Sequence, residues 1–259
     1  MICLYRFAAI VALLLLSTRV CSQSSSFREN ANHTHTWLMY FGNHKFSGKL
    51  GLHAEAQLRR SDVISGKQQL LLRTGLDIYT PQVRYTVGYA FIETYPYGDF
   101  PVANAFPEHR LWQQALVSNG IGKIKLSHRY RLEQRWLGNS TTGQFENGRY
   151  ENRMRYMVRA NIPLKGNSIE AGTFYLGLYN EVFVNFGKEV GYNIFDQNRV
   201  YGAICYHLGK VGRLEVGYLY QLVQQRRLIS SSDPRNILEN NHTLQLALFS
   251  ELPLYKEKK

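Results

Sequence analysis

The chain has 259 residues and a formal net charge of +12, from 31 lysines and arginines against 19 aspartates and glutamates. This length fits one large all-β domain as well as two ordinary domains, so length alone does not settle the organisation. A basic balance is compatible with nucleic acid, but an N-terminal export signal argues against that partner and favours anionic lipid headgroups, lipopolysaccharide phosphates or anionic solutes. The 18 tyrosines and 13 phenylalanines are typical of β-strands and of interfacial aromatic girdles.

The N-terminus has the pattern of a secretory signal. Arg6 precedes an apolar run at 7–16, which is too short to span a bilayer as a helix. Residues 1–22 are therefore predicted to be a signal peptide. Cys21 leaves open a lipoprotein that begins at this cysteine, although the residues before it are larger than such cleavage prefers. Once the signal is removed, Cys205 is the only cysteine, so no intrachain disulfide is expected.

From residue 36 onward, polar and apolar residues alternate with a period of two, which no helix fits. Residues 23–35 are polar without a pattern and are interpreted as a flexible lead-in. Most of the predicted strands reach the roughly nine to eleven residues that a tilted membrane strand requires. The predicted strands are 36–46, 49–59, 67–79, 82–94, 108–118, 122–136, 150–162, 168–184, 197–208, 212–224 and 239–251.

Short and long connections alternate along the chain, as in a barrel whose hairpins turn on both sides of a membrane. Tight turns rich in Gly, Asn or Pro are expected at 47–48, 80–81, 119–120, 165–167 and 209–210. Longer links are expected at 60–66, 95–107, 137–149, 185–196 and 225–238. Eleven strands is an odd number, whereas single-chain bacterial barrels usually have an even one. The prediction is therefore about twelve strands, with ten as the alternative; either a strand is hidden in 225–238 or the long stretch 168–184 is misjudged.

Two-residue turns fix the register of a hairpin and so predict which residues face each other. The turn at 119–120 places Glu108 opposite Arg131, and the turn at 80–81 places Asp77 opposite Arg84. In both hairpins the charged side chains gather on one face of the sheet and the apolar side chains on the other.

Two architectures have a sheet with one apolar and one polar face. A soluble sandwich or lipocalin-like barrel points its apolar face inward, whereas an outer-membrane barrel points it toward lipid around a polar lumen. Long strands, a polar face dense in arginine and glutamate, and the export signal favour the second. The chain is thus predicted to be an all-β, antiparallel, up-and-down transmembrane barrel at 36–252, followed by a basic tail at 253–259.

Four segments resemble the domain-of-unknown-function family 2490. They are Glu108–Gln114 (EHRLWQQ), Ser127–Arg135 (SHRYRLEQR), Tyr179–Phe183 (YNEVF) and Phe195–Tyr201 (FDQNRVY). The similarity covers most of residues 36–250. The resemblance implies an outer-membrane barrel with a signal peptide, and it carries over no activity.

The best candidate site is a cluster of arginines and glutamates on the polar face, where arginine forks can grip a carboxylate or phosphate at two points. Three consecutive strands carry most of it, so it should form one patch inside the barrel. It either binds or passes small anionic or polar solutes, or it ties the wall together and plugs a narrow lumen, leaving a structural or interaction barrel. Its members are Glu108, Arg110, Arg129, Arg131, Glu133, Arg135, Arg153, Arg155, Arg159, Glu181 and Arg199, with Glu151 among them.

Catalytic and metal-binding patterns are weak. His109 and His128 alternate onto the apolar face and no Gly-x-Ser-x-Gly pattern occurs, so a lipid-acting enzyme at the membrane surface is the least favoured hypothesis. His33 and His35 have no third ligand in view, and no glycine-rich nucleotide loop is present, so no metal or cofactor is expected. Cys205 is interpreted as a packed wall residue. The expected partners are outer-membrane lipid, lipopolysaccharide and small anionic solutes, with no nucleic acid.

Overall fold

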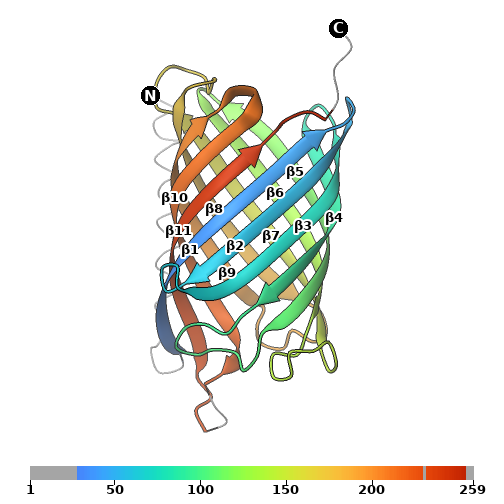
Figure 1. Cartoon of the computed structure of the whole chain (residues 1–259), viewed down its shortest axis with the longest axis vertical. Helices are drawn as coiled ribbons and strands as arrows, with labels where there is room; N and C mark the ends of the chain where they lie inside the picture. The colour runs from blue at the N-terminus through green and yellow to red at the C-terminus, as the bar shows by residue number, and fades with distance from the viewer. Residues whose placement is uncertain (1–27, 230–231, 255–259) are drawn as a thin grey trace.

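The computed structural model describes residues 28–229 and 232–254, which form a closed barrel of eleven strands (Figure 1). The strands follow one another round the barrel in chain order. The expected signal peptide, with Cys21, lies outside the described residues, as does the end of the predicted tail. The strands are β1 (Arg28–Lys45), β2 (Leu50–Ser61), β3 (Gly66–Tyr79), β4 (Val83–Thr94), β5 (Phe106–Ile121), β6 (Ile124–Leu137), β7 (Arg149–Pro163), β8 (Phe174–Phe186), β9 (Phe195–His207), β10 (Gly212–Leu228) and β11 (Asn236–Ser250).

The odd number of strands determines how the barrel closes. In an up-and-down barrel each strand reverses the direction of the one before it, so the first and eleventh strands run the same way. The β1–β11 pair is parallel, with Arg28–Gly42 registered against Asn236–Ser250, and the other neighbouring pairs are antiparallel. Parallel pairing is slightly weaker per residue than antiparallel pairing. The predicted count of twelve or ten is therefore wrong.

Among the described residues of 225–238, which hold the end of β10 and the start of β11, there is no extra strand. Apart from the strands, the described chain contains one short 3-10 turn, Gly209–Val211, between β9 and β10. Within the described residues, no helix is long and apolar enough to cross a bilayer.

Strand β1 begins at Arg28, eight residues before the predicted start, so the interpretation of 23–35 as a flexible lead-in is wrong from that residue on. Its burial alternates: Ala31, His33 and His35 are buried inside, whereas Asn32 and its second neighbours are exposed. Polar residues occupy both faces of this stretch. Alternation of polarity therefore cannot reveal the strand, although alternation of burial is present.

The predicted register of the β5–β6 hairpin is also wrong. The turn lies at Gly122 and the following lysine rather than at 119–120, so Glu108 faces Leu137 and Arg131 faces Gln114. The register differs from the prediction by an even number of residues. Because side chains change face with a period of two, every residue keeps its predicted face.

The β3–β4 hairpin shows the same kind of difference. Its register differs from the prediction by two residues, so Asp77 faces Thr86 and Arg84 faces Tyr79. Thr86 donates a hydrogen bond to Asp77 at 2.6 Å, while Arg84 reaches Asp77 diagonally at 4.0 Å. The two charged groups share the inner face as predicted, but they are not directly opposed.

Other connections differ in length. The link before β8 is 164–173 rather than a tight turn, so β8 starts six residues later than predicted. The expected long link at 60–66 is only the four-residue turn 62–65. The long connections 95–105, 138–148, 187–194 and 229–235 lie at one end of the barrel, at the bottom of Figure 1, and the described C-terminal residues lie at the other.

The two surfaces of the barrel differ in chemistry. Each of the eleven strands exposes at least one large apolar side chain on the outside, for example Leu72 on β3, Val87 on β4 and Val216 on β10, which are 46%, 50% and 54% exposed. The buried side chains inside include eight arginines and eight carboxylates. The apolar face therefore points outward and the charged face inward.

A glycine pair makes room for the largest interior side chain. Gly75 on β3 and Gly88 on β4 face each other, and Gly88 faces Trp112 on β5. A Cβ atom on Gly75 would lie 3.2 Å from the Trp112 indole, and one on Gly88 would lie 2.1 Å from the Thr74 carbonyl oxygen. The fully buried indole thus lies over this pair.

Candidate site: a charged network and a cavity inside the barrel

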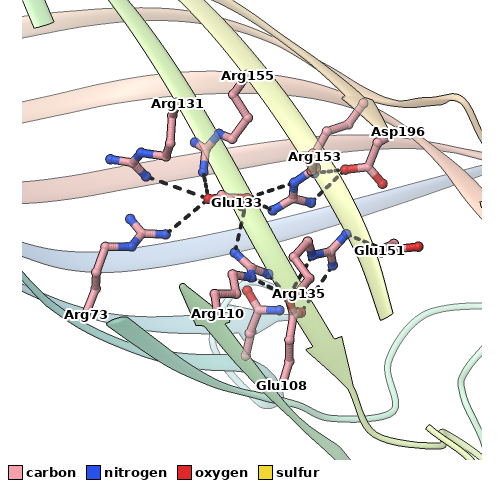
Figure 2. A network of polar contacts seen from close by, with 12 residues as sticks. Arg73, Glu108, Arg110, Arg131, Glu133, Arg135, Glu151, Arg153, Arg155 and Asp196 are labelled. Atoms are coloured by element: carbon pink, nitrogen blue, oxygen red, sulfur yellow. Dashed lines mark hydrogen bonds and ion pairs between the residues drawn. The ribbon is translucent and has the colours of Figure 1, made fainter. Parts of the chain in front are cut away.

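The centre of the interior is the carboxylate of Glu133 on β6, which is fully buried (Figure 2). Arg153 donates two hydrogen bonds to its Oε2 atom, at 2.9 and 2.6 Å, and Arg155 donates one to Oε1 at 2.8 Å. Guanidinium nitrogens of Arg73, Arg110 and Arg131 lie 3.7, 3.8 and 4.0 Å from the same carboxylate. One carboxylate therefore holds five arginines from β3, β5, β6 and β7.

Glu108 on β5 is the second node. Arg110 donates two hydrogen bonds to it, and Arg135 donates two more, at 2.7 and 3.2 Å. Arg135 also donates to Glu151 on β7 at 2.6 Å. Because Arg110 lies near both Glu108 and Glu133, the two nodes form one network.

The network extends in both directions round the wall. Glu181 on β8 accepts from Arg129 at 2.7 Å and from Arg155 at 3.0 Å. On the other side Arg73 donates to Glu55 on β2 at 2.6 Å. Asp196 on β9 accepts from Arg153 at 2.7 Å. The network thus joins β2, β3 and β5 to β9, all through residues with low exposure.

Of the predicted cluster, two residues lie outside this network. Arg159 belongs to a separate group, where it donates to Glu215 on β10 at 2.7 Å, and Arg213 donates to the same carboxylate at 2.8 Å. Arg199 on β9 has no carboxylate among the described ion pairs and donates to Gln197 at 3.1 Å. The network contains the other nine: Glu108, Arg110, Arg129, Arg131, Glu133, Arg135, Arg153, Arg155 and Glu181.

The sequence analysis did not include four residues that form ion pairs inside the barrel: Glu55, Arg73, Asp196 and Glu215. Alternation already placed Glu55 and Glu215 on the polar face, and the parity of Asp77 places Arg73 there as well. Their membership depends on which strands meet across the lumen, which alternation does not tell.

The rest of the interior wall has a different chemistry. Strands β1, β10 and β11 contribute Trp37, Gln221, Asn241, Thr243 and Gln245, all buried and all uncharged. The same strands also carry two buried carboxylates, Glu215 on β10 and Glu239 on β11, so this wall is mainly rather than wholly uncharged.

A cavity of about 630 Å³ lies between these walls. Five carboxylates line it, from Glu55, Glu108, Glu181, Asp196 and Glu251. Thirteen arginines and one lysine line it as well: Arg59, Arg73, Arg84, Arg110, Arg129, Arg131, Arg135, Arg149, Arg153, Arg155, Arg159, Arg199, Arg213 and Lys125. The surface of the cavity is therefore strongly basic, even though most of its arginines are paired.

The loop 95–105 covers part of the lumen at the long-loop end. Its Tyr97 donates a hydrogen bond to Glu239 on β11 at 3.1 Å and contacts the rings of His33 and His35 edge-on. Burial, together with the adjacent Glu239 carboxylate, raises the pKa of the Tyr97 hydroxyl. A loop from between β4 and β5 thus reaches the far wall and narrows this mouth.

The other candidate residues lie outside the charged network. His109 and His128 lie on the outer face, beside Tyr89 and Tyr156, as alternation predicts. Cys205 is buried inside the barrel as a free thiol. In the part of the chain that the structure describes, no group of three or more His, Cys, Asp or Glu side chains is arranged to hold a metal ion.

The comparisons with known proteins give one family and no individual relative. No curated protein and no solved structure matches the chain. A model of a protein family of unknown function, DUF2490, matches residues 34–229, which span every strand from most of β1 to the end of β10. The chain therefore belongs to the DUF2490 family, as its four sequence segments suggest.

Proposed function

We propose that this protein is an outer-membrane β-barrel whose lumen binds small anionic solutes and passes them slowly. The outer face supports the membrane placement. A soluble protein rarely exposes a large continuous apolar patch, whereas all eleven strands here expose large apolar side chains. The strands also exceed the length that a tilted membrane strand needs. The short turns would then lie on the periplasmic side and the long loops outside, where they meet lipopolysaccharide.

The cavity supports the anionic solute. It has the volume of an ordinary small-molecule site, and its lining carries fourteen cationic side chains against five carboxylates. The excess of positive charge on this lining is the observation that carries the proposal, because it attracts anions and repels cations. The network and the loop that carries Tyr97 narrow the path, so binding with slow passage fits better than a wide channel.

A charge on the outer face tests the membrane placement. Leu72 lies in the middle of β3, between Ala56 and Phe91 on the neighbouring strands. Leu72→Arg should lower the stability of the barrel in lipid vesicles by about 2–4 kcal/mol if this site faces the bilayer core. Ile64→Arg, in an exposed turn between strands, is the matched control and should change little. Equal, small effects of both substitutions would overturn the placement.

Ion selectivity tests whether the lumen favours anionic solutes. The refolded protein is placed in a planar bilayer between unequal KCl solutions and the reversal potential is measured. A small current that favours chloride over potassium is expected. A current that favours potassium would contradict the proposal.

A structural barrel with a plugged lumen is the second candidate, and the Glu133 network favours it because paired charges fill the middle of the lumen. Absence of both current and anion binding, from a barrel that migrates differently on detergent gels before and after heating, would support this candidate over the first.

A further inference from the structure

Two interior arginines differ from the rest in having no carboxylate oxygen within ion-pair distance, although Glu181 lies opposite Arg199 in the β8–β9 register. Among the described residues, neither Arg59 on β2 nor Arg199 on β9 lies within 4.0 Å of a carboxylate oxygen, whereas the arginines around Glu133 all do. A guanidinium group stays charged at any physiological pH, and one that is withdrawn from water is normally paired with an anion. Both side chains line the same 630 Å³ cavity.

Neutral amides hold these two arginines in place. Arg59 donates to Gln57 at 2.9 and 2.6 Å and to Gln69 at 2.7 Å, while Arg199 donates from its Nε atom to Gln197 at 3.1 Å. Amide oxygens satisfy N–H donors but leave the positive charge in place. No described protein atom accepts from the terminal nitrogens of Arg199, and these nitrogens are not sealed from the cavity.

The Trp37 indole limits the distance between the two guanidinium groups. The guanidinium carbons of Arg59 and Arg199 lie 3.9 and 5.1 Å from the centre of a Trp37 ring, so they are at most about 9 Å apart. Trp37 is itself buried and donates from Nε1 to Gln68 at 2.8 Å. A separation of at most about 9 Å between the guanidinium carbons allows one oxyanion to accept hydrogen bonds of about 2.8 Å from both groups.

We propose that Arg59 and Arg199, positioned by Trp37 and its surrounding glutamines, form a binding site for one small oxyanion, a phosphate or carboxylate group of a solute. This inference rests on the proposed function and names its site and ligand class. Most arginines of the network donate to carboxylates, while Arg131 donates to the Gln114 amide and lies 4.0 Å from Glu133. A solute anion that enters the cavity therefore finds at Arg59 and Arg199 the two guanidinium groups that lie farther than this from any described carboxylate oxygen. The amide wall opposite the network accepts neutral parts of the same solute through hydrogen bonds.

Calorimetric titration of the refolded full chain tests the site. Inorganic phosphate and succinate are the probes, in a chloride background. Saturable binding of phosphate, succinate or both is expected. Arg59→Gln and Arg199→Gln should each weaken it about tenfold or more, because each removes a two-point charged contact. Arg213→Gln is the matched control, since Arg213 lines the same cavity but is paired with Glu215 and Glu251.

Arg59→Lys and Arg199→Lys separate a loss of binding from a loss of folding, because lysine keeps the positive charge but lacks the planar two-point donor group of arginine. A partial loss of affinity is expected for both variants. Heat-dependent migration on a detergent gel checks that each variant forms the barrel. If the wild type binds but both glutamine variants bind as well as Arg213→Gln, this inference is overturned while the proposed function stands. If the wild type binds neither probe and its current does not favour anions, both fail.

Discussion

Glu133→Gln is the most direct perturbation of the interior. The substitution keeps the shape of the side chain and one acceptor oxygen, but it removes the charge that five arginines share. Three charged hydrogen bonds end on this carboxylate, two from Arg153 and one from Arg155, and the group is fully buried. Breaking a buried ion pair from one side typically costs about 3–5 kcal/mol, because the remaining charge stays buried without a partner.

We therefore expect Glu133→Gln to lower the free energy of unfolding by at least about 3 kcal/mol, the lower end of that range, because several charges lose the same partner. Reversible urea unfolding in lipid vesicles, followed by tryptophan fluorescence, measures it. Glu251→Gln is the matched control: Glu251 is 58% exposed and pairs with Arg213 at 3.4 Å, so a loss of about 0–1 kcal/mol is expected. A Glu133→Gln barrel as stable as the Glu251→Gln barrel would refute the idea that the network ties the wall together.

Three further predictions concern the interior. Arg153→Gln should lower stability by about 3–5 kcal/mol, since Arg153 joins the buried carboxylate of Glu133 to that of Asp196. Arg199→Gln should change stability by less than about 1 kcal/mol or raise it, because the buried guanidinium group that it removes has no described carboxylate oxygen within 4.0 Å. Parallel urea titrations compare the two variants, and equal losses would contradict this difference. Trp112→Ala should lower stability by about 3–5 kcal/mol in the same assay, because the fully buried indole lies over the Gly75–Gly88 pair. A loss under about 1 kcal/mol would show that neighbouring side chains close the space that the indole leaves. The Cys205 thiol should react with a maleimide only after the barrel is unfolded by heat, as measured by mass spectrometry, and rapid labelling of the folded barrel would show that the lumen is open to reagents at this point.

Alternation predicted the faces of the strands far better than it predicted their ends. The period of two places the charged cluster on one face and His109 and His128 on the other. Which face points inward was predicted from the strand lengths, the density of arginine and glutamate and the export signal. Register errors of two or six residues in the β3–β4 and β5–β6 hairpins left these assignments intact, because an even shift does not change the face. The first eight residues of β1 were not predicted as strand, because residues 28–35 carry polar side chains on both faces.

Contacts across the lumen could not be predicted in the same way. Arg73 on β3 approaches Glu133 on β6, and Arg153 on β7 pairs with Asp196 on β9. These pairs lie two or three strands apart in the wall, so their geometry depends on the number of strands and on the curvature of the closed sheet. The strand count itself was misjudged, because a general preference for even numbers was applied to a sequence whose own turns indicate eleven.

The division of the lumen into a charged wall and an amide wall connects stability with binding. On the charged wall, carboxylates take up most of the donor capacity of the arginines, so those arginines fix the positions of the strands and offer little to a solute. On the side of Trp37, the partners of Arg59 and Arg199 are neutral, so the charge of these two groups remains for something that enters the cavity. A ligand can therefore come and go at this side without breaking the ties on the other. The prediction that Arg199→Gln spares the fold and weakens anion binding, while Arg153→Gln weakens the fold, expresses this separation in two measurable quantities.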